Sequence, residues 1–319
     1  MPHDPKLTRR ELIAAGTCAA ILPSTDRSAG SDGSVRFIPM PGWGQTTDKL
    51  RWGVGIVCDS QDRIYVHSRS TRAVIVFDRH GRPLHHFGSE FSATGHGLTY
   101  HKDGRAEYLY FCDHGRNQVV KTDLLGRTLL RIGEIHKVGP NSIPFPFNQP
   151  TDLAVAPDGR LFVAEGYGGN RVQVFDKAGR YLQSIGGPGS GPGKFNCPHG
   201  IWVDTRKREP ELYVADRSNQ RIQILTLEGK FKRAISGPVS LPNGFAEHRG
   251  NLFVADLDQR VAILDRNDRL VAHLGGASSK PAGEGIAFSA PHAACVDSRG
   301  DLYVIEWAES AQVKKFRRV

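Results

Sequence analysis

One pattern recurs six times along the chain, and this repetition constrains the fold more than any other feature. Each unit has a turn, usually Asp-Gly or a near variant, then an aromatic-rich apolar strand, a polar loop and a second strand. The aromatic-rich strands are centred on residues 64–66, 109–111, 161–163, 212–214, 252–254 and 302–304. Their spacing of about 40 to 50 residues is typical of propeller blades.

A shorter apolar strand precedes each aromatic-rich strand, and we expect it to be the innermost of four strands in a blade. The segment Val35-Arg36-Phe37-Ile38 stands alone before the first unit, and the sixth unit runs out near Phe316 without an outer strand. We therefore predict an all-β fold, a six-bladed β-propeller with four antiparallel strands per blade. The N- and C-terminal strands close the ring together and so protect the sheet edges.

The first thirty residues have a different character from the repeats. Arg9 and Arg10 come directly before a short apolar run from Leu12 to Leu22, and Pro23 and small residues follow it. This order predicts a twin-arginine-type export signal over residues 1–30, with the propeller over 31–319. We accordingly expect an exported protein, periplasmic or secreted. The apolar run is too short to span a bilayer and no later segment could, so no membrane anchor is predicted.

The formal charge of +9 belongs to the propeller itself, because the first thirty residues are nearly balanced. The only basic cluster, at residues 314–318, has no interleaved tyrosine or tryptophan, so we predict no nucleic-acid partner and expect a monomer. Cysteines of the propeller show no close-spaced framework and no CxxC pair, which favours buried small apolar residues: Cys58, Cys112, Cys197 and Cys295.

Positions that recur in every blade serve the fold, whereas positions that differ between blades are candidates for function. Five blades carry an acidic residue after the aromatic-rich strand, and the first blade has Ser68 there instead. Such repetition predicts hydrogen bonding between loops rather than catalysis. The five are Asp113, Glu165, Asp216, Asp256 and Glu306.

The residue that begins each innermost strand differs from blade to blade: Val54, His96, Thr151, His199, Asn243 and His292. Histidine occupies alternate blades, so a quasi-sixfold ring places three imidazoles a third of a turn apart around the axis. Three neutral imidazoles with an open fourth position suit a catalytic zinc ion, although other divalent transition metals accept the same ligands. A single histidine there would more simply be a polar residue lining a water-filled tunnel.

The loops after the aromatic-rich strands should point to the same mouth of the propeller. Arg69 and Arg217 stand at equivalent places and offer donors for a carboxylate or an oxyanion. Tyr167 offers a phenol whose pKa a nearby cation could lower for base catalysis. The alternatives are interblade salt bridges for the arginines and a packed ring for the tyrosine. His114 ends a second strand near this mouth and could support the site.

These features resemble NHL repeats, and more specific segments resemble the peptidyl-α-hydroxyglycine α-amidating lyases, zinc propellers that finish peptide amidation. The segments are Gly95 to Thr99, Phe147 to Asp152 with Glu165 to Tyr167, Phe195 to His199 with Ala215 to Gln223, and Ala290 to His292. The resemblance implies that His96, His199 and His292 bind zinc, that Tyr167 is the catalytic base and that Arg69 and Arg217 are the active-site arginines. It also implies cleavage of a carbon–nitrogen bond to give an amide and glyoxylate.

Two departures from the animal enzymes bear on this expectation. Gly168 follows Tyr167 in place of a disulfide cysteine, and Ala293 follows His292 in place of an aspartate associated with calcium, which argues against calcium here. We expect a small-molecule or short-peptide substrate with a carboxylate. Two other functions stay open, a metal-dependent hydrolase such as a lactonase and a non-catalytic NHL binding module.

Overall fold

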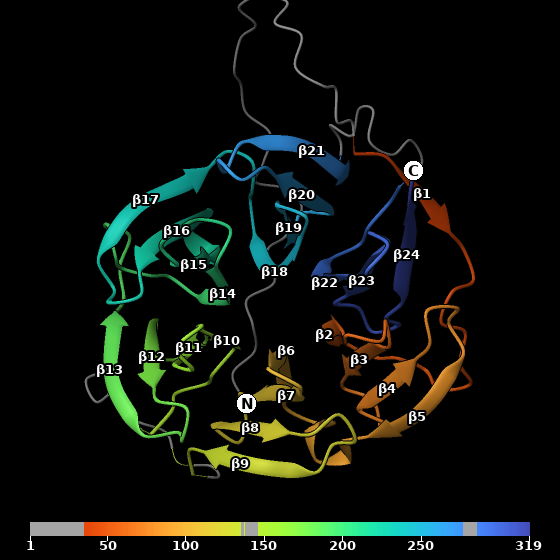
Figure 1. Cartoon of the computed structure of the whole chain (residues 1–319), viewed down its shortest axis with the longest axis horizontal. Helices are drawn as coiled ribbons and strands as arrows, with labels where there is room; N and C mark the ends of the chain where they lie inside the picture. The colour runs from red at the N-terminus through yellow and green to blue at the C-terminus, as the bar shows by residue number, and fades with distance from the viewer. Residues whose placement is uncertain (1–34, 135–136, 138–145, 277–285) are drawn as a thin grey trace, which may run out of the picture. The chain divides into compact units, whose positions relative to one another are not determined.

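The computed structural model describes residues 35–134, 137, 146–276 and 286–319, which form six four-stranded antiparallel sheets around a central axis (Figure 1). The predicted twin-arginine segment, residues 1–30, lies outside the described residues. Within the described part of the chain, helical structure is confined to two 3-10 turns, Ser89–Phe91 and Arg217–Asn219, and no helix is long and apolar enough to cross a membrane. The six-bladed β-propeller is confirmed.

Each blade is built from the axis outwards in chain order, and its first strand is innermost (Figure 1). Blade 1 contains β2 (Gly53–Cys58), β3 (Ile64–Ser68), β4 (Val74–Phe77) and β5 (Pro83–Phe87). Blade 2 contains β6 (Gly95–Asp103), β7 (Ala106–Asp113), β8 (Gln118–Thr122) and β9 (Thr128–Ile132). Blade 3 contains β10 (Asp152–Val155), β11 (Leu161–Glu165), β12 (Arg171–Phe175) and β13 (Tyr181–Gly186).

The last three blades follow the same plan, except for the outermost strand of blade 6. Blade 4 contains β14 (Pro198–Asp204), β15 (Glu211–Asp216), β16 (Arg221–Thr226) and β17 (Phe231–Ser236). Blade 5 contains β18 (Pro242–His248), β19 (Asn251–Asp256), β20 (Arg260–Leu264) and β21 (Leu270–Gly275). Blade 6 contains β22 (Pro291–Val296), β23 (Leu302–Glu306), β24 (Val313–Arg318) and then β1 (Phe37–Met40).

The predicted closure of the ring is present as the pairing of β1 with β24, in which Phe37 lies opposite Arg318 and Met40 opposite Lys315. Phe37 is 4% exposed and its ring packs edge-on against Phe253 of blade 5, with centroids 6.1 Å apart. The first described strand therefore contributes both ladder hydrogen bonds and apolar burial to the last blade.

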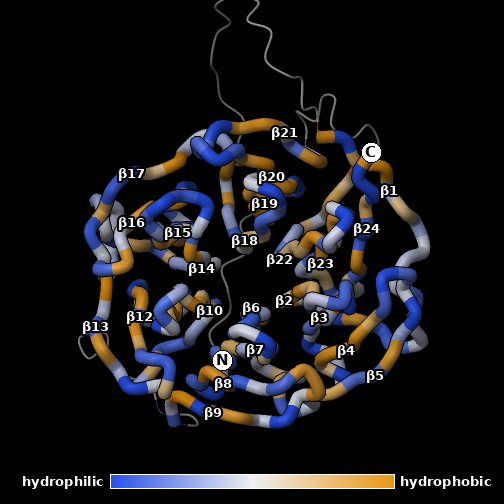
Figure 2. Tube along the Cα trace, in the orientation of Figure 1, coloured by the Kyte–Doolittle hydropathy of each residue, from blue (hydrophilic) through white to orange (hydrophobic). Residues whose placement is uncertain are grey.

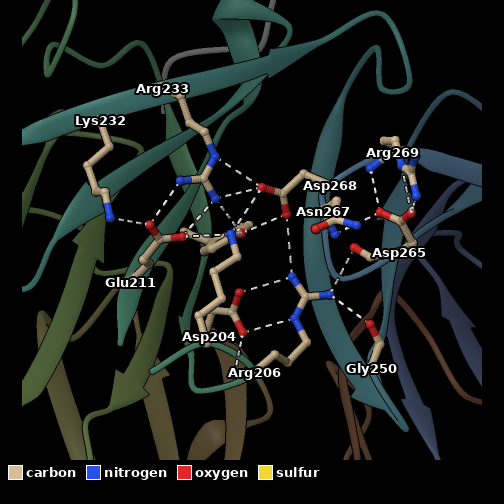
Figure 3. Close-up of polar contacts among 12 residues, drawn as sticks. Asp204, Arg206, Glu211, Lys232, Arg233, Gly250, Asp265, Asn267, Asp268 and Arg269 are labelled. Carbon is tan, nitrogen blue, oxygen red and sulfur yellow. Dashed lines mark hydrogen bonds and ion pairs between the residues drawn. The ribbon is translucent and has the colours of Figure 1, made fainter. Parts of the chain in front are cut away.

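Apolar side chains fill the interfaces between blades, and hydrophobic residues recur along the strands of every blade (Figure 2). Phe162 of blade 3, for example, belongs to the same buried cluster as Leu212 of blade 4. Polar contacts add to this packing between blades 4 and 5 (Figure 3), where the Asp268 carboxylate accepts hydrogen bonds from Tyr213 at 2.7 Å and Arg233 at 2.6 Å. Arg206 extends from blade 4 to the carbonyls of Gly250 and Asp265.

The repeated carboxylates serve the fold, as their recurrence predicted. Each buried acid holds the segment that leads into the innermost strand of its own blade. Glu165, for example, accepts a hydrogen bond from the backbone N–H of Asn148 at 2.6 Å, and Asp216 accepts one from Asn196 at 2.7 Å. These bonds fix the segments that lead into β10 and β14, and so the height along the central axis at which Thr151 and His199 stand.

The residue of each blade nearest the start of its innermost strand is called here its ring residue: Val54, His96, Thr151, His199, Asn243 and His292. In several blades glycine follows the ring residue, because the innermost strands approach one another too closely for a side chain. A Cβ atom at Gly97 would lie 2.5 Å from the carbonyl oxygen of Thr151, and one at Gly200 would collide with the carbonyl oxygen of Asn243. Both contacts would be closer than any normal van der Waals contact. The backbones of neighbouring blades therefore meet directly at the axis.

We expect Phe37→Ala to destabilise the propeller by about 3–5 kcal/mol, because the substitution leaves a cavity beneath the closing strand. Ile38→Ala is the matched control, since Ile38 lies on the same strand and is 42% exposed; its cost should stay below about 1 kcal/mol. Urea unfolding followed by fluorescence measures both. Equal losses in the two variants would contradict the role assigned to this contact.

Candidate metal centre

Three histidines meet at the axis, as the alternation in sequence predicted. His96, His199 and His292 are the second residues of the innermost strands of blades 2, 4 and 6 and are 1%, 2% and 5% exposed. Their ring centroids are 4.7, 5.0 and 5.1 Å apart, close to threefold symmetry. One potential ligand atom from each lies within 4.8 Å of the others, so the three imidazoles could hold a metal ion.

Backbone carbonyls of the intervening blades orient two of these imidazoles. His96 Nδ1 donates to the carbonyl oxygen of Thr151 at 2.8 Å, and His199 Nδ1 donates to that of Asn243 at 3.3 Å. A carbonyl can only accept, so Nδ1 carries the proton and Nε2 keeps its lone pair for a metal. The Nδ1 of His292 lacks a hydrogen-bond partner among the described residues, although the backbone of Val54 also favours the protonated form of this imidazole.

Sequence reasoning missed this role of the non-histidine ring positions. Thr151 and Asn243 stood out only as the residues that interrupt the histidine pattern, yet their carbonyls supply the orienting acceptors. Every residue type has a carbonyl, so side-chain identity carries no signal for the interaction. The six ring positions thus divide into three imidazoles and three intervening residues, of which Thr151 and Asn243 orient an imidazole through their backbone carbonyls.

All three imidazoles are neutral near pH 7. Burial is the largest cause that lowers the pKa of each below its usual 6.5. Positive neighbours add to this, and together burial, Arg217 and Arg69 bring the pKa of His292 to about 3. Neutral imidazoles are the form that binds a metal.

Tyr167 reaches the histidine ring from the loop after β11. Its hydroxyl lies 3.0 Å from His96 Nε2 and 3.0 Å from His199 Nε2, while the outer part of its ring leaves the residue 40% exposed at the mouth. Burial of the hydroxyl raises the pKa of Tyr167, and the Arg217 guanidinium, 5.4 Å from the ring centroid, opposes that rise. The predicted cation is present, but burial outweighs it, so the pKa of Tyr167 is raised.

The two predicted arginines stand on opposite sides of the mouth, Arg69 in blade 1 and Arg217 in blade 4. Arg217 donates to Asn243 Oδ1 at 3.3 Å and contacts Cys197 Sγ at 3.1 Å. Arg69 donates to the Gly95 carbonyl at 3.4 Å. Within the described ranges neither guanidinium forms an ion pair with a carboxylate, so the salt-bridge alternative is not what the structure shows.

His114 and two tryptophans complete the mouth. His114 Nε2 lies 2.5 Å from the Arg69 guanidinium, which only donates, so the imidazole accepts; burial and Arg69 lower its pKa to about 4. The Arg69 Cζ atom lies 4.8 Å from the centroid of the Trp307 ring. Trp307 also packs against Trp52, and the centroids of the two rings are 4.8 Å apart. Trp52 was missed because it precedes β2, outside the repeated loop positions.

Behind the histidines, a central channel of about 370 Å³ runs between the innermost strands of all six blades. Asp152 lines this channel, and burial raises the pKa of its carboxyl to about 7. Its oxygens accept from the Ile201 backbone N–H at 3.2 Å and from the Thr99 hydroxyl at 3.5 Å. These bonds join blades 2, 3 and 4 just behind the ring.

Comparisons with known proteins agree with this fold. A family described as a 6-bladed beta-propeller matches residues 145–260. A gluconolactonase from Xanthomonas campestris has a similar structure, with a TM-score of 0.64 and 17% identity over 90% of this chain and 91% of that one. At this identity the likeness concerns the fold alone.

Two of the curated relatives illustrate the sequence similarity. The probable peptidyl-alpha-hydroxyglycine alpha-amidating lyase of Caenorhabditis elegans is 29% identical over 210 residues, which is 65% of this chain and 55% of that protein. NHL repeat-containing protein 3 of Mus musculus is 30% identical over 169 residues, 50% of this chain and 48% of that protein. The matches thus cover about half the length of these relatives. The chain is a six-bladed β-propeller similar in sequence to amidating lyases and to NHL-repeat proteins.

Proposed function

We propose that this protein is a zinc-dependent lyase that cleaves the carbon–nitrogen bond of an α-hydroxyglycine-type carbinolamide to give an amide and glyoxylate. The observation that carries the proposal is the position of the Tyr167 hydroxyl, 3.0 Å from two of three convergent neutral imidazoles. Among the described residues, the two guanidinium groups at the same mouth, Arg69 and Arg217, have no carboxylate partner. Sequence similarity to an amidating lyase of C. elegans supports the assignment.

The residues at the axis fit a zinc ion. His96, His199 and His292 are buried, neutral and convergent, and two of them have the Nδ1 proton fixed by a carbonyl. Three imidazole nitrogens with an open fourth position are a common zinc ligand set in catalytic sites. No carboxylate belongs to the set, which disfavours calcium.

Tyr167 is the proposed base. A zinc ion held by the three imidazoles would make the substrate hydroxyl more acidic and would stabilise the phenolate. Tyr167 takes the hydroxyl proton, the electron pair of the oxygen forms the new carbonyl, and the carbon–nitrogen bond breaks. The nitrogen keeps the bonding pair and receives the proton that Tyr167 took, so the products are the amide and glyoxylate. Arg217, which faces Tyr167, favours its ionised form.

Arg69 and Arg217 are the proposed carboxylate ligands. Both are partly buried, and each keeps N–H groups that no carboxylate in the described structure neutralises. A planar guanidinium binds a carboxylate through two parallel hydrogen bonds, which would fix the α-hydroxy acid relative to Tyr167.

We expect purified protein to contain, after reconstitution, one zinc ion per chain. His199→Ala should retain less than about a tenth of an equivalent, because two imidazoles hold zinc far more weakly than three. His86→Ala is the control, since His86 is exposed on β5 and should not change the metal content. Atomic absorption measures all three. A wild-type protein that holds no metal would instead favour a non-catalytic propeller.

Zinc affinity should change less than about threefold between pH 7.5 and pH 6. Folded-state pKa values far below 6.5 keep the imidazoles neutral over this window, whereas three histidines of ordinary pKa would lose roughly fiftyfold in affinity to protonation. Competition with a chromophoric chelator at each pH gives the affinity. A fiftyfold loss would show that the histidines titrate as exposed groups.

Tyr167→Phe should leave zinc content unchanged and reduce glyoxylate release from α-hydroxyhippurate by at least about a hundredfold, the usual contribution of a general base. Tyr181→Phe is the matched control, because Tyr181 is 39% exposed on β13, away from the mouth. Retained activity would remove Tyr167 from its role. Ring opening of a lactone without glyoxylate would favour a hydrolase with the same metal.

A further inference from the structure

We propose that Trp52 and Trp307 form the binding surface for an apolar, preferentially aromatic acyl group on the substrate nitrogen. This inference rests on the proposed function and extends it by naming the chemical class of the part that does not react. Aromatic side chains offer large, rigid contact area, and paired rings prefer offset or edge-on arrangements.

Trp307 stands next to the reacting groups. It follows β23 at the loop position that holds Arg69 in blade 1 and, in blade 3, Gly166, the residue before Tyr167. Its ring centroid lies 5.7 Å from that of His292, and the Arg69 guanidinium lies 4.8 Å from it. The indole therefore touches both a candidate metal ligand and a candidate carboxylate anchor.

Trp52 continues this surface towards the rim, with its ring centroid 4.8 Å from that of Trp307 and a tilt of 42°. Its φ of 51° is unfavourable for a bulky residue. Its backbone N–H donates to the Ala308 carbonyl at 2.7 Å, and the neighbouring Trp307 N–H donates to Ala290 at 2.8 Å. The first of these hydrogen bonds joins blades 1 and 6, and so stabilises the left-handed backbone that presents an indole at the mouth.

Trp43 shows what a structural role of a tryptophan looks like in this protein. The Trp43 N–H donates to the Arg79 carbonyl at 2.9 Å, and its ring packs against Phe77 and Tyr303. Trp52 and Trp307 are partly exposed, as Trp43 is, but among residues 35–134, 137, 146–276 and 286–319 neither of their indole N–H groups forms a hydrogen bond. Both N–H groups are therefore available to a ligand.

The positions of the blades indicate the direction in which the acyl group on the substrate nitrogen can extend. Tyr167 belongs to blade 3 and Trp307 to blade 6, so they stand across the axis from each other (Figure 1). A substrate whose hydroxyl meets Tyr167 and whose carboxylate contacts the arginines can extend its nitrogen substituent towards blades 6 and 1. That is where the two indoles lie.

The test compares binding of two unreactive analogues, N-benzoylglycine and N-acetylglycine, to the zinc-loaded protein by calorimetry. Both keep the carboxylate and lack the hydroxyl, so neither can be cleaved. We expect N-benzoylglycine to bind at least about tenfold more tightly, the size of a well-packed phenyl contact. Trp52→Ala should reduce this ratio to below about threefold.

Trp52→Gly is the second variant, because glycine adopts positive φ without strain and removes the indole while preserving the backbone. It should lower the ratio as Trp52→Ala does. Tyr181→Ala, which removes an exposed aromatic ring from β13, should leave the ratio unchanged. An unchanged ratio in both Trp52 variants, or no binding of either analogue to the wild-type protein, would overturn the proposal.

This experiment separates failure of the subsite from failure of the proposed reaction. If α-hydroxyhippurate yields no glyoxylate but the binding ratio is present and depends on Trp52, the acyl site stands and the lyase assignment falls. If benzoyl- and acetyl-hydroxyglycine are cleaved with equal kcat/KM and the binding ratio is near one, the lyase stands and the acyl site falls.

Discussion

Direct contact between the backbones of neighbouring blades at the axis is the constraint on which the rest of the structure depends. Gly97 and Gly200 leave no room for a side chain, so the carbonyls of Thr151 and Asn243 come close enough to accept from imidazole nitrogens. The alternation of histidine with other residues thus has a physical reason. An imidazole in one blade uses the backbone of the next, and a histidine in every blade would crowd the axis with like donors.

Those parts of the fold and site that repeat could be predicted from the sequence, and those that do not repeat could not. The blades, the closing strand and the histidine set each follow from comparing equivalent positions. Trp52 escaped because the position two residues before each ring residue holds a different residue type in every blade, Gln149 and Cys197 among them, so no pattern marked it. Its contact with Trp307 joins the first and last blades. The sign of the Tyr167 pKa shift also needed coordinates, because burial and a guanidinium oppose each other and only geometry shows which is larger.

Within the described residues, two partly buried arginines at this mouth lack a carboxylate partner. Several arginines elsewhere meet carboxylates, as Arg171 meets Glu165 at 2.7 Å and Arg233 meets Asp268 at 2.6 Å. At the mouth, Arg69 and Arg217 meet a carbonyl, an imidazole, an amide and a thiol instead. Leaving a charge partly buried without its opposite costs stability. An anion bound between them would remove that cost, which supports the proposed carboxylate site.

Closure of the ring by β1 and β24 also governs when the site can exist. The three histidines come from blades 2, 4 and 6, and blade 6 is complete only after a strand from near each end of the propeller has paired. Contacts between residues so distant in sequence form slowly during folding. A cation that needed all three imidazoles would bind the finished ring and not its precursors, and so would favour the closed molecule at equilibrium. Metal content would then report whether the ring has closed.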